Sequence, residues 1–480
     1  MDKQRLIAEL QRVVGRRYVI HHPDDLLVYE YDGSVDRGMP TAVVFPADTA
    51  QTAAVVKLAH QAGVPIVPRG AGTGLSGGAI AVAGGVEIAM TRMRRVLEVD
   101  TANRIAVVEP GLVNLDLSTA VAPMGLYYAP DPSSQRACTI GGNVAENSGG
   151  PHCLRYGTTT NHVLALEIVL EDGSVVWLGD RYRGGPGYDL VGAFVGSEGM
   201  MGVVTKAVVR LLPMPESVST MMAVFPEMDQ ASAAVSRVIG SGFIPSAMEM
   251  MDKLSIKAVE TAMRFGYPQD AGAVLLIEVD GIAEETAEAS ASVQALCRGE
   301  GASEIRAATE AAERARLWAG RKGALGALGT LAPNYYLVDG VVPRTQLLTV
   351  LRRVGEISRD VGFPIANVFH AGDGNLHPCV LFDERQKGHT PRVLEAGGEI
   401  LKACVAAGGT LTGEHGVGLE KKAFMPLVYT DADLGAMLRL KQAFAPSGLL
   451  NPGKVFPGGP SCGEGFRPAS AAKADAGMWV

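Results

Sequence analysis

Hydrophobic positions in the first 70 residues predict a helix followed by a strand–helix–strand unit. Residues 6–14 carry apolar side chains at helical spacing. Apolar residues 43–45 then form a candidate strand, Asp48 or Thr49 a helix cap, Gly63 a helix stop and residues 64–67 a second strand. Because such a unit crosses over a sheet, we expect its two strands to be parallel.

The remaining pattern predicts a hairpin and then a module that mixes helices and strands. Residues 163–179 read as a hairpin that turns at Asp172 and Gly173. Beyond about residue 215 the pattern predicts an α+β module. Its expected strands are 220–226, 273–281 and 363–377, and its expected helices are 227–240, 283–298, 344–361, 391–407 and 432–445. The last twenty or so residues are polar and small, as in a flexible tail.

Three glycine-rich loops separate the predicted strands. Residues 68–79 contain Gly72, Gly74 and Gly77 in a GxGxxG spacing. A Rossmann fold would need a helix directly afterwards, whereas the next segment is broken by glycines and returns to a strand, so we reject that fold. The loop either exposes backbone N–H groups to a pyrophosphate or is a glycine-rich hairpin that binds nothing. The second loop, 131–157, lacks periodicity, and loops of that length usually bind something.

The third glycine-rich loop, within 192–213, again precedes a strand. Together the three loops indicate one cofactor cradle.

Composition narrows the class of protein. The chain has 480 residues, of which 51 are acidic and 43 are Lys or Arg, and the net charge of −8 argues against nucleic acid as a partner. Apolar residues make up 47%, enough for sizeable cores. The six cysteines contain no CxxC pair, which excludes an iron–sulfur or zinc site made of thiolates and suits a reduced, cytoplasmic compartment. No apolar run is long enough to span a membrane, so we expect membrane association only through a partner.

Two short polar loops hold the candidate chemistry. HAGDGNLH contains His370 and His377, and GEHG contains Glu414 and His415. Two histidines and a carboxylate suit a divalent ion with positions open for substrate, and His415 could then take a proton. Each histidine alone could equally be a hydrogen-bonded structural residue, and Glu414 a helix cap or an ion-pair partner. Asp373 is better explained as closing a turn than as a metal ligand.

With these segments assembled, residues 5–457 resemble the FAD-linked 2-hydroxy acid dehydrogenases of the vanillyl-alcohol oxidase/p-cresol methylhydroxylase superfamily. The motifs that carry the resemblance are PRGAGTGLSGGA, APDPSSQRACTIGGNVAENSGGPHCLRYG, FVGSEGMMGVVT, HAGDGNLHP, TGEHGVG and NPGK. Within that family they look most like the glycolate oxidase flavin subunit, with D-lactate and D-2-hydroxyglutarate dehydrogenases as relatives.

The resemblance implies an α+β fold with a two-part FAD-binding domain and a cap domain that contains an antiparallel sheet. We therefore expect an N-terminal helical segment at 1–36, the FAD domain at 37–214, the cap domain at 215–425, a segment at 426–457 that returns to the flavin, and a tail at 458–480.

The resemblance also implies a set of cofactor-binding residues. They are Arg69, Gly70, Ala71, Gly72, Thr73, Gly74, Leu75 and Ser76 at the pyrophosphate, and Pro130, Asp131, Thr139, Gly141, Gly142, Ala145, Ser148, Gly149, Gly199, Gly202, Val203 and Asn451 elsewhere along the flavin. The loop that cradles the cofactor lacks a His or Cys at the positions where covalently flavinylated relatives carry one. We therefore expect FAD to be bound noncovalently. His152 is then a local hydrogen-bonding residue.

For the reaction, the resemblance implies a divalent metal, Zn or Mn, on His370, His377 and Glu414, with His415 as base and Arg321 on the substrate carboxylate. The hydrogen on the substrate Cα would pass to flavin N5. Cys379 stands where the D-2-hydroxyglutarate branch has Asn, and the basic residue of that branch is missing around Leu337, which favours glycolate or D-lactate.

Partners follow from the same resemblance. Electrons would leave to a carrier or a redox subunit and not to a nicotinamide, and a homo-oligomer stays open. Two alternatives remain: a noncatalytic flavin-binding subunit of an oxidase, and a related flavoenzyme of ether-lipid synthesis, which would need a membrane-facing apolar surface.

Overall fold

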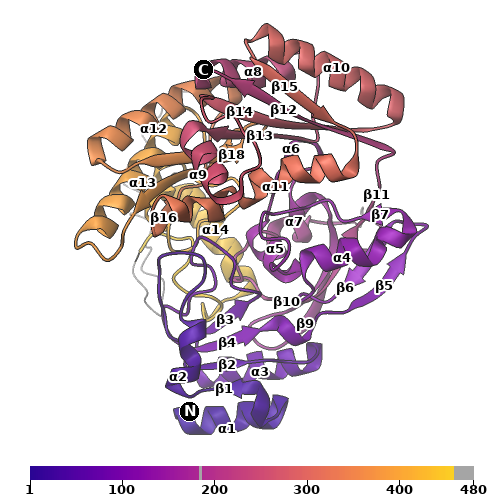
Figure 1. Ribbon diagram of the computed structural model, residues 1–480. Helices are drawn as coiled ribbons and strands as arrows, with labels where there is room; N and C mark the ends of the chain where they lie inside the picture. Colours follow the sequence, from indigo (N-terminus) through magenta and orange to yellow (C-terminus); the bar gives the residue numbers. More distant parts are fainter. Residues whose placement is uncertain (183–185, 459–480) are drawn as a thin grey trace, which may run out of the picture.

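A computed structural model describes residues 1–182 and 186–458. The chain forms three layers that follow one another along the sequence, from the indigo N-terminal unit through a purple central sheet to a large magenta and orange module (Figure 1). The predicted tail, apart from Gly458, lies outside the described residues.

The N-terminal unit is a four-stranded sheet with helices packed on it. Its strands are β1 (Val19–Ile20), β2 (Ala42–Val44), β3 (Ile66–Arg69) and β4 (Val86–Ala89), in the order β1-β2-β4-β3. Its helices are α1 (Lys3–Val14), α2 (Pro23–Leu26) and α3 (Thr49–Ala62). The Asp48 carboxylate caps α3 by accepting from the Gln51 N–H at 2.8 Å, and Gly63 ends the helix in the left-handed conformation.

The predicted strand–helix–strand unit is confirmed, with one addition. Strands β2 and β3 are parallel, but β4 lies between them and pairs with both. The glycine loop therefore leaves the end of β3 and returns into the middle of the sheet. No helix lies between β3 and β4, which agrees with the prediction that this is not a Rossmann fold.

The central layer is a five-stranded antiparallel sheet. Its strands run in the order β5 (Val96–Asp100), β6 (Ile105–Val108), β10 (Val203–Arg210), β8 (Val163–Val169) and β9 (Val175–Gly179). Helices α4 (Asn114–Val121), α5 (Ile140–Glu146) and α7 (Leu190–Phe194) share a buried apolar core with it. The predicted hairpin is β8–β9, and the Asp172 carboxylate closes its turn by accepting from the Ser174 N–H at 2.8 Å. A short ladder of β7 (Leu126–Tyr127) and β11 (Leu212–Pro213) leads out of this layer.

The prediction that residues 131–157 form one long loop is wrong. The segment contains α5 and the short helix α6 (Cys153–Tyr156). The Thr139 hydroxyl caps α5 by accepting from the Gly142 N–H at 3.3 Å, and Ile140 and Val144 are buried one turn apart. A helix this short, with two glycines, gives too few apolar positions for its period to be read.

The third layer is a nine-stranded antiparallel sheet. Its strands are β12 (Ser217–Phe225), β13 (Ala247–Asp252), β14 (Ala273–Gly281), β15 (Glu304–Ala308), β16 (Asn334–Leu337), β17 (Gly340–Val341), β18 (Ile365–His370), β19 (Asn375–Leu376) and β20 (Pro378–Phe382). One core joins it to α8 (Met228–Gly240), α10 (Ala283–Gly299), α12 (Leu347–Val361) and α13 (His389–Ala406). A separate core joins it to α9 (Lys253–Met263) and α11 (Ala311–Ala327).

The C-terminal part of the described chain returns to the N-terminal unit. Helix α14 (Asp431–Phe444) is followed by residues that lie beside β3. There the Ile66 N–H donates to the Leu449 carbonyl at 2.8 Å, and the Asn451 N–H donates to the Ile66 carbonyl at 2.7 Å. Because β3 leads directly into the glycine loop, this return also braces that loop. Among the described residues no helix is long and apolar enough to cross a bilayer.

Candidate active site

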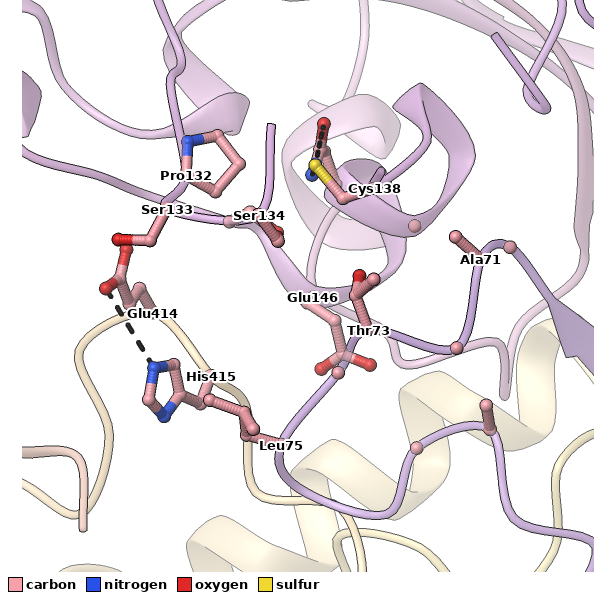
Figure 2. A pocket seen from close by; sticks show the side chains of 18 of the residues that line it. Ala71, Thr73, Leu75, Pro132, Ser133, Ser134, Cys138, Glu146, Glu414 and His415 are labelled. Carbon is pink, nitrogen blue, oxygen red and sulfur yellow. Dashed lines mark hydrogen bonds and ion pairs between the residues drawn. The ribbon is translucent and has the colours of Figure 1, made fainter. Parts of the chain in front are cut away.

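A cavity of about 390 Å³ lies where the layers meet, and its size suits a bound ligand. Figure 2 shows Ala71 and Thr73 of the glycine loop on one side of it, with Glu414 and His415 on the opposite side and Pro132, Ser133 and Ser134 above. The cavity is therefore walled both by the glycine loops and by the third layer.

Most of the predicted cofactor residues line this cavity or a smaller one of about 50 Å³ that shares several of its residues. Those on the larger cavity are Gly70, Ala71, Gly72, Thr73, Gly74, Leu75, Thr139, Gly142, Ala145, Ser148 and Gly199. The smaller one adds Arg69, Gly141, Gly202 and Val203. Ser76, Pro130, Asp131 and Asn451 line neither, and Gly149 lines a third cavity. Asn451 instead donates from its side-chain amide to the carbonyls of Gly78 and Glu198.

The glycine loops leave space that the protein itself does not use. A Cβ on Gly74 would meet no atom within 4 Å, and one on Gly142 would meet only the Thr139 hydroxyl at 3.4 Å. Neither glycine has a positive φ that would require its identity. Packing and backbone conformation therefore do not explain these two glycines, whereas close approach by an elongated ligand does.

The three predicted metal ligands converge. His370 ends β18, His377 follows β19 and Glu414 lies in the loop after α13, yet one side-chain donor atom of each lies within 4.8 Å of the others. His370 Nε2 is 3.0 Å from Glu414 Oε1, and His377 Nε2 is 3.4 Å from the same oxygen. Although burial alone would raise it, the neighbouring His370 and His377 lower the pKa of Glu414 to about 2.

Two further observations suit a metal at this cluster. Apart from its ion-pair contacts, the Nε2 atom of buried His377 makes no hydrogen bond to any described residue. The other nitrogen of His370, Nδ1, lies 2.7 Å from the Glu249 carboxylate, the arrangement in which a carboxylate orients a metal-binding imidazole. His377 also belongs to a second convergent set with Asp339 and His415. Asp373 closes its turn as expected, because its carboxylate accepts from the Asn375 N–H at 3.2 Å.

His415 lies on the cavity wall next to this cluster. Its ring stacks on that of His377, with ring centres 4.9 Å apart. Burial, which outweighs the opposing effect of Asp339, lowers the pKa of His415 to about 4. The imidazole is therefore neutral near pH 7.

Asp339 organises the loop that carries Glu414 and His415, and the sequence analysis missed it. Its buried carboxylate accepts from the N–H of Gly413 at 3.1 Å and of His415 at 3.0 Å, and from the Thr412 hydroxyl. The ammonium of Lys421, which is also fully buried, donates to it at 3.1 Å. Although burial alone would raise it, Lys421 and His415 lower the pKa of Asp339 well below its usual value.

Arg321 reaches the cavity from α11. It is buried and pairs with Glu249, with 2.6 Å between the guanidinium and the carboxylate. Its Nε–H makes no hydrogen bond to any residue that the structure describes. Glu249 thus contacts both Arg321 and His370, and it too was missed by the sequence analysis.

Two glutamates on the cavity wall were likewise missed. Glu198 accepts from the N–H groups of Val417 and Gly418, each at 2.7 Å, which ties the third glycine loop to the segment after His415. Burial and the nearby Glu198 raise the pKa of Glu146 well above its usual value. Figure 2 shows the Glu146 side chain directed into the cavity.

His152 is a hydrogen-bonding residue, as expected, but its contacts are not local, because they join two layers. Its Nδ1 lies 2.8 Å from Asp131 and its Nε2 3.1 Å from Glu278 of β14. Despite burial, which lowers it, the two carboxylates raise the pKa of His152 to about 10. The protonated ring therefore bridges the second glycine loop to the third layer.

Fold and sequence comparisons identify the class of protein. Residues 40–179 match the FAD binding domain family, and residues 214–455 match the family of FAD linked oxidases, C-terminal domain. The chain belongs to the FAD-linked oxidase family, and it is an FAD-dependent oxidoreductase.

Two sequence relatives and one solved structure are similar to this chain over most of its length. The chain is 44% identical to glycolate oxidase subunit GlcD of Escherichia coli K12, over 97% of this chain and 93% of that protein. It is 32% identical to D-lactate dehydrogenase of Archaeoglobus fulgidus, over 94% of this chain and 98% of that protein. The structure of p-cresol methylhydroxylase with substrate bound superposes with a TM-score of 0.78 at 16% identity, over 94% of this chain and 96% of that one. The fold class and the resemblance inferred from the sequence are confirmed.

The free space at Gly74 gives a test of the cofactor cradle. We expect Gly74→Val to leave the free energy of unfolding of the FAD-free protein within about 0.5 kcal/mol of the wild type, because a Cβ at this position has no protein atom within 4 Å. The Kd for FAD should rise at least about tenfold, because the new side chain fills ligand space. Fluorescence titration with FAD measures this. Gly240→Val at the end of α8, which also meets no atom, is the control and should leave the Kd unchanged.

Proposed function

We propose that this protein oxidises glycolate or a small D-2-hydroxy acid such as D-lactate to the 2-oxo acid, with FAD as the electron acceptor and a divalent metal in assistance. The observation that carries the proposal is that His377, Glu414, His415 and Arg321 share one cavity with the glycine loops. A proton acceptor, a metal-ligand set and an anion-binding group thus face the place kept free for the flavin.

Arg321 binds the substrate carboxylate in this scheme. A guanidinium is a planar donor that suits a carboxylate, Arg321 lines the cavity, and its Nε–H has no hydrogen-bond partner among the described residues. The Glu249 contact also fixes the guanidinium in place before the substrate arrives. The substrate would thereby be held with its Cα and hydroxyl toward the histidines.

His370, His377 and Glu414 would hold the metal, with Zn²⁺ or Mn²⁺ as the candidates. Two imidazoles and a carboxylate suit either ion and leave positions open. When bound, the metal would act as a Lewis acid that lowers the pKa of the substrate hydroxyl.

His415 takes the hydroxyl proton. Its ring is neutral in the site, is held by the Asp339 contacts of its loop, and faces the cavity beside Glu414. The C–O bond becomes a carbonyl as the Cα hydrogen departs with its electron pair. FAD, when bound, supplies the acceptor of that hydride at N5. One proton and one hydride thus leave the acid for different groups.

The flavin is held without a covalent bond. Cys138 is the cysteine on the cavity wall, and burial raises the pKa of its thiol, so the thiol stays protonated and is a poor nucleophile. His152 is engaged by Asp131 and Glu278 and does not line the cavity.

Apolar side chains on the cavity wall favour a substrate with a single carboxylate. Leu325 and Leu337 line it, with Tyr335 beside them. Lys322 also reaches the wall, with its ammonium 5.5 Å from the centre of the Trp318 ring. D-2-hydroxyglutarate is therefore included in the experiment below, because Lys322 is the cation that a second carboxylate could meet.

Electrons leave to a carrier or a partner redox subunit and not to a nicotinamide. The name of the Escherichia coli relative, glycolate oxidase subunit, supports a partner of this kind. The alternative of a noncatalytic flavin subunit is disfavoured because a binding scaffold would not need His415 and Arg321 on the same wall.

Flavin bleaching without oxygen tests the proposal. We expect the FAD-loaded protein to lose its flavin absorbance with glycolate or D-lactate, and to respond much less to L-lactate and D-2-hydroxyglutarate. Prior removal of metal with a chelator should slow bleaching at least about a hundredfold, and added Zn²⁺ or Mn²⁺ should restore it. Absence of bleaching by every acid, with FAD and metal both present, would favour the noncatalytic alternative.

A further inference from the structure

A second chamber lies behind the metal-ligand cluster. It measures about 160 Å³ and is lined by His370 and Glu414 together with Asp373, Asn375 and Cys153. Glu414 also lines the flavin-side cavity, while His370 lines only the chamber and His377 only the flavin side. The cluster is therefore the partition between two cavities.

The chamber carries oxygen donors that the fold does not use. Asn375 is 5% exposed, and within the described part of the chain its side-chain carbonyl oxygen has no hydrogen-bond partner. The Asp373 carboxylate accepts one backbone hydrogen bond, and no Lys or Arg nitrogen of the described residues lies within 4.0 Å of it. A buried unpartnered amide oxygen is costly unless something binds it, and hard oxygen donors are the groups that hydrated divalent cations contact.

The chamber is also partly open to solvent. Asp373, Cys153 and Thr158 are each partly exposed, whereas His370 and Asn375 at its inner end are buried. Cys153 and Glu414 approach each other at Gly149, because a Cβ on this glycine would lie 2.9 Å from both Cys153 Sγ and Glu414 Oε2. Carboxylates at both ends, Asp373 and Glu414, attract cations along this path.

We propose that this chamber is the port through which a hydrated divalent cation reaches His370, His377 and Glu414 while FAD occupies the larger cavity. The inference rests on the metal site of the proposed function and adds the direction from which the site is loaded. Asp373 and Asn375 make transient contacts with the incoming ion and are not its final ligands. A port residue of this kind changes the rates of loading and release by the same factor and leaves the equilibrium constant nearly unchanged.

Zinc uptake by the FAD-loaded, metal-stripped protein tests the port. Zn²⁺ is added alone, uptake is stopped with a chelator after timed intervals, and bound zinc is counted by elemental analysis. We expect Asp373→Asn to slow uptake and release about tenfold each, with the Kd changed less than threefold. The substitution keeps the turn, because an amide oxygen can still accept from the Asn375 N–H.

Asp172→Asn is the matched control. Asp172 closes the β8–β9 turn by the same contact, from its carboxylate to the N–H two residues on, and lies outside both cavities. Its substitution should leave zinc uptake at the wild-type rate. Equal uptake rates in wild type and Asp373→Asn would overturn the port, as would uptake that FAD loading slows more than tenfold, because the ion would then pass through the flavin side.

Failure of the metal site itself would look different. If the wild-type protein bound neither Zn²⁺ nor Mn²⁺ at equilibrium, the metal assignment of the proposed function would be wrong, and the port with it. Stoichiometric binding at rates that ignore Asp373 would remove the port alone.

Discussion

Replacing His415 with alanine is expected to leave FAD bound while the rate constant for flavin reduction by glycolate or D-lactate falls by about a thousandfold or more. The fall follows from the loss of the proposed proton acceptor, because a positioned general base contributes about 10² to 10⁴ in rate. FAD should stay, because the space kept free for the ligand lies along the glycine loops and not at the imidazole. Rapid mixing without oxygen measures the rate constant, and the yellow absorbance measures the cofactor.

A matched histidine separates loss of the base from loss of any histidine. His60 lies on α3, away from both cavities. The substrate should therefore reduce the flavin of the His60→Ala protein at the wild-type rate. Normal reduction by the His415→Ala protein would remove His415 from the role of base.

The second large effect concerns the buried pair of Asp339 and Lys421. We expect Asp339→Asn to lower the free energy of unfolding by about 3–5 kcal/mol, because Lys421 is left as an uncompensated charge with no exposed surface. Lys421→Met should lower the free energy of unfolding by a similar amount, because the buried Asp339 carboxylate then lacks its ammonium partner. The double variant Asp339→Asn/Lys421→Met should recover most of that loss, because neither charge remains. Denaturant unfolding measures all three.

Catalysis should not recover with stability in the double variant. The Asp339 carboxylate holds the N–H groups of Gly413 and His415, and a neutral amide binds them less strongly. We therefore expect flavin reduction in the double variant to stay about a hundredfold slower than in the wild type, although the free energy of unfolding has largely recovered. Recovery of both together would mean that Asp339 acts only on folding. Glu399→Gln breaks the exposed ion pair with Lys402. It should change neither the free energy of unfolding nor the rate of flavin reduction.

The sequence predicted those parts of the site that are local in the chain. The glycine loops and the two histidine loops show as short polar runs at the ends of apolar strands, and the structure places His370, His377 and Glu414 together. The pattern also predicted the hairpin at Asp172 and the cap at Asp48, because a turn or a cap is specified by a few neighbouring residues.

The missed residues depend on contacts between distant segments. Glu249 is a single carboxylate in a buried strand, and it meets His370 because β13 and β18 pair with those two residues opposite each other. Asp339 finds its partners more than seventy residues away, in the loop at 412–415 and at Lys421. Nothing in the local pattern around either residue specifies that register. The same holds for β4, which enters the sheet between β2 and β3.

In the proposed reaction, the hydrogen on the substrate Cα passes to the flavin while the hydroxyl proton passes to His415. The most direct measurement compares glycolate with glycolate deuterated at Cα, mixed rapidly and without oxygen with the FAD- and metal-loaded protein. We predict complete loss of flavin absorbance in one turnover, slowed severalfold by the deuterium. A fully loaded protein that keeps its flavin oxidised in excess glycolate, D-lactate and related 2-hydroxy acids would contradict the account.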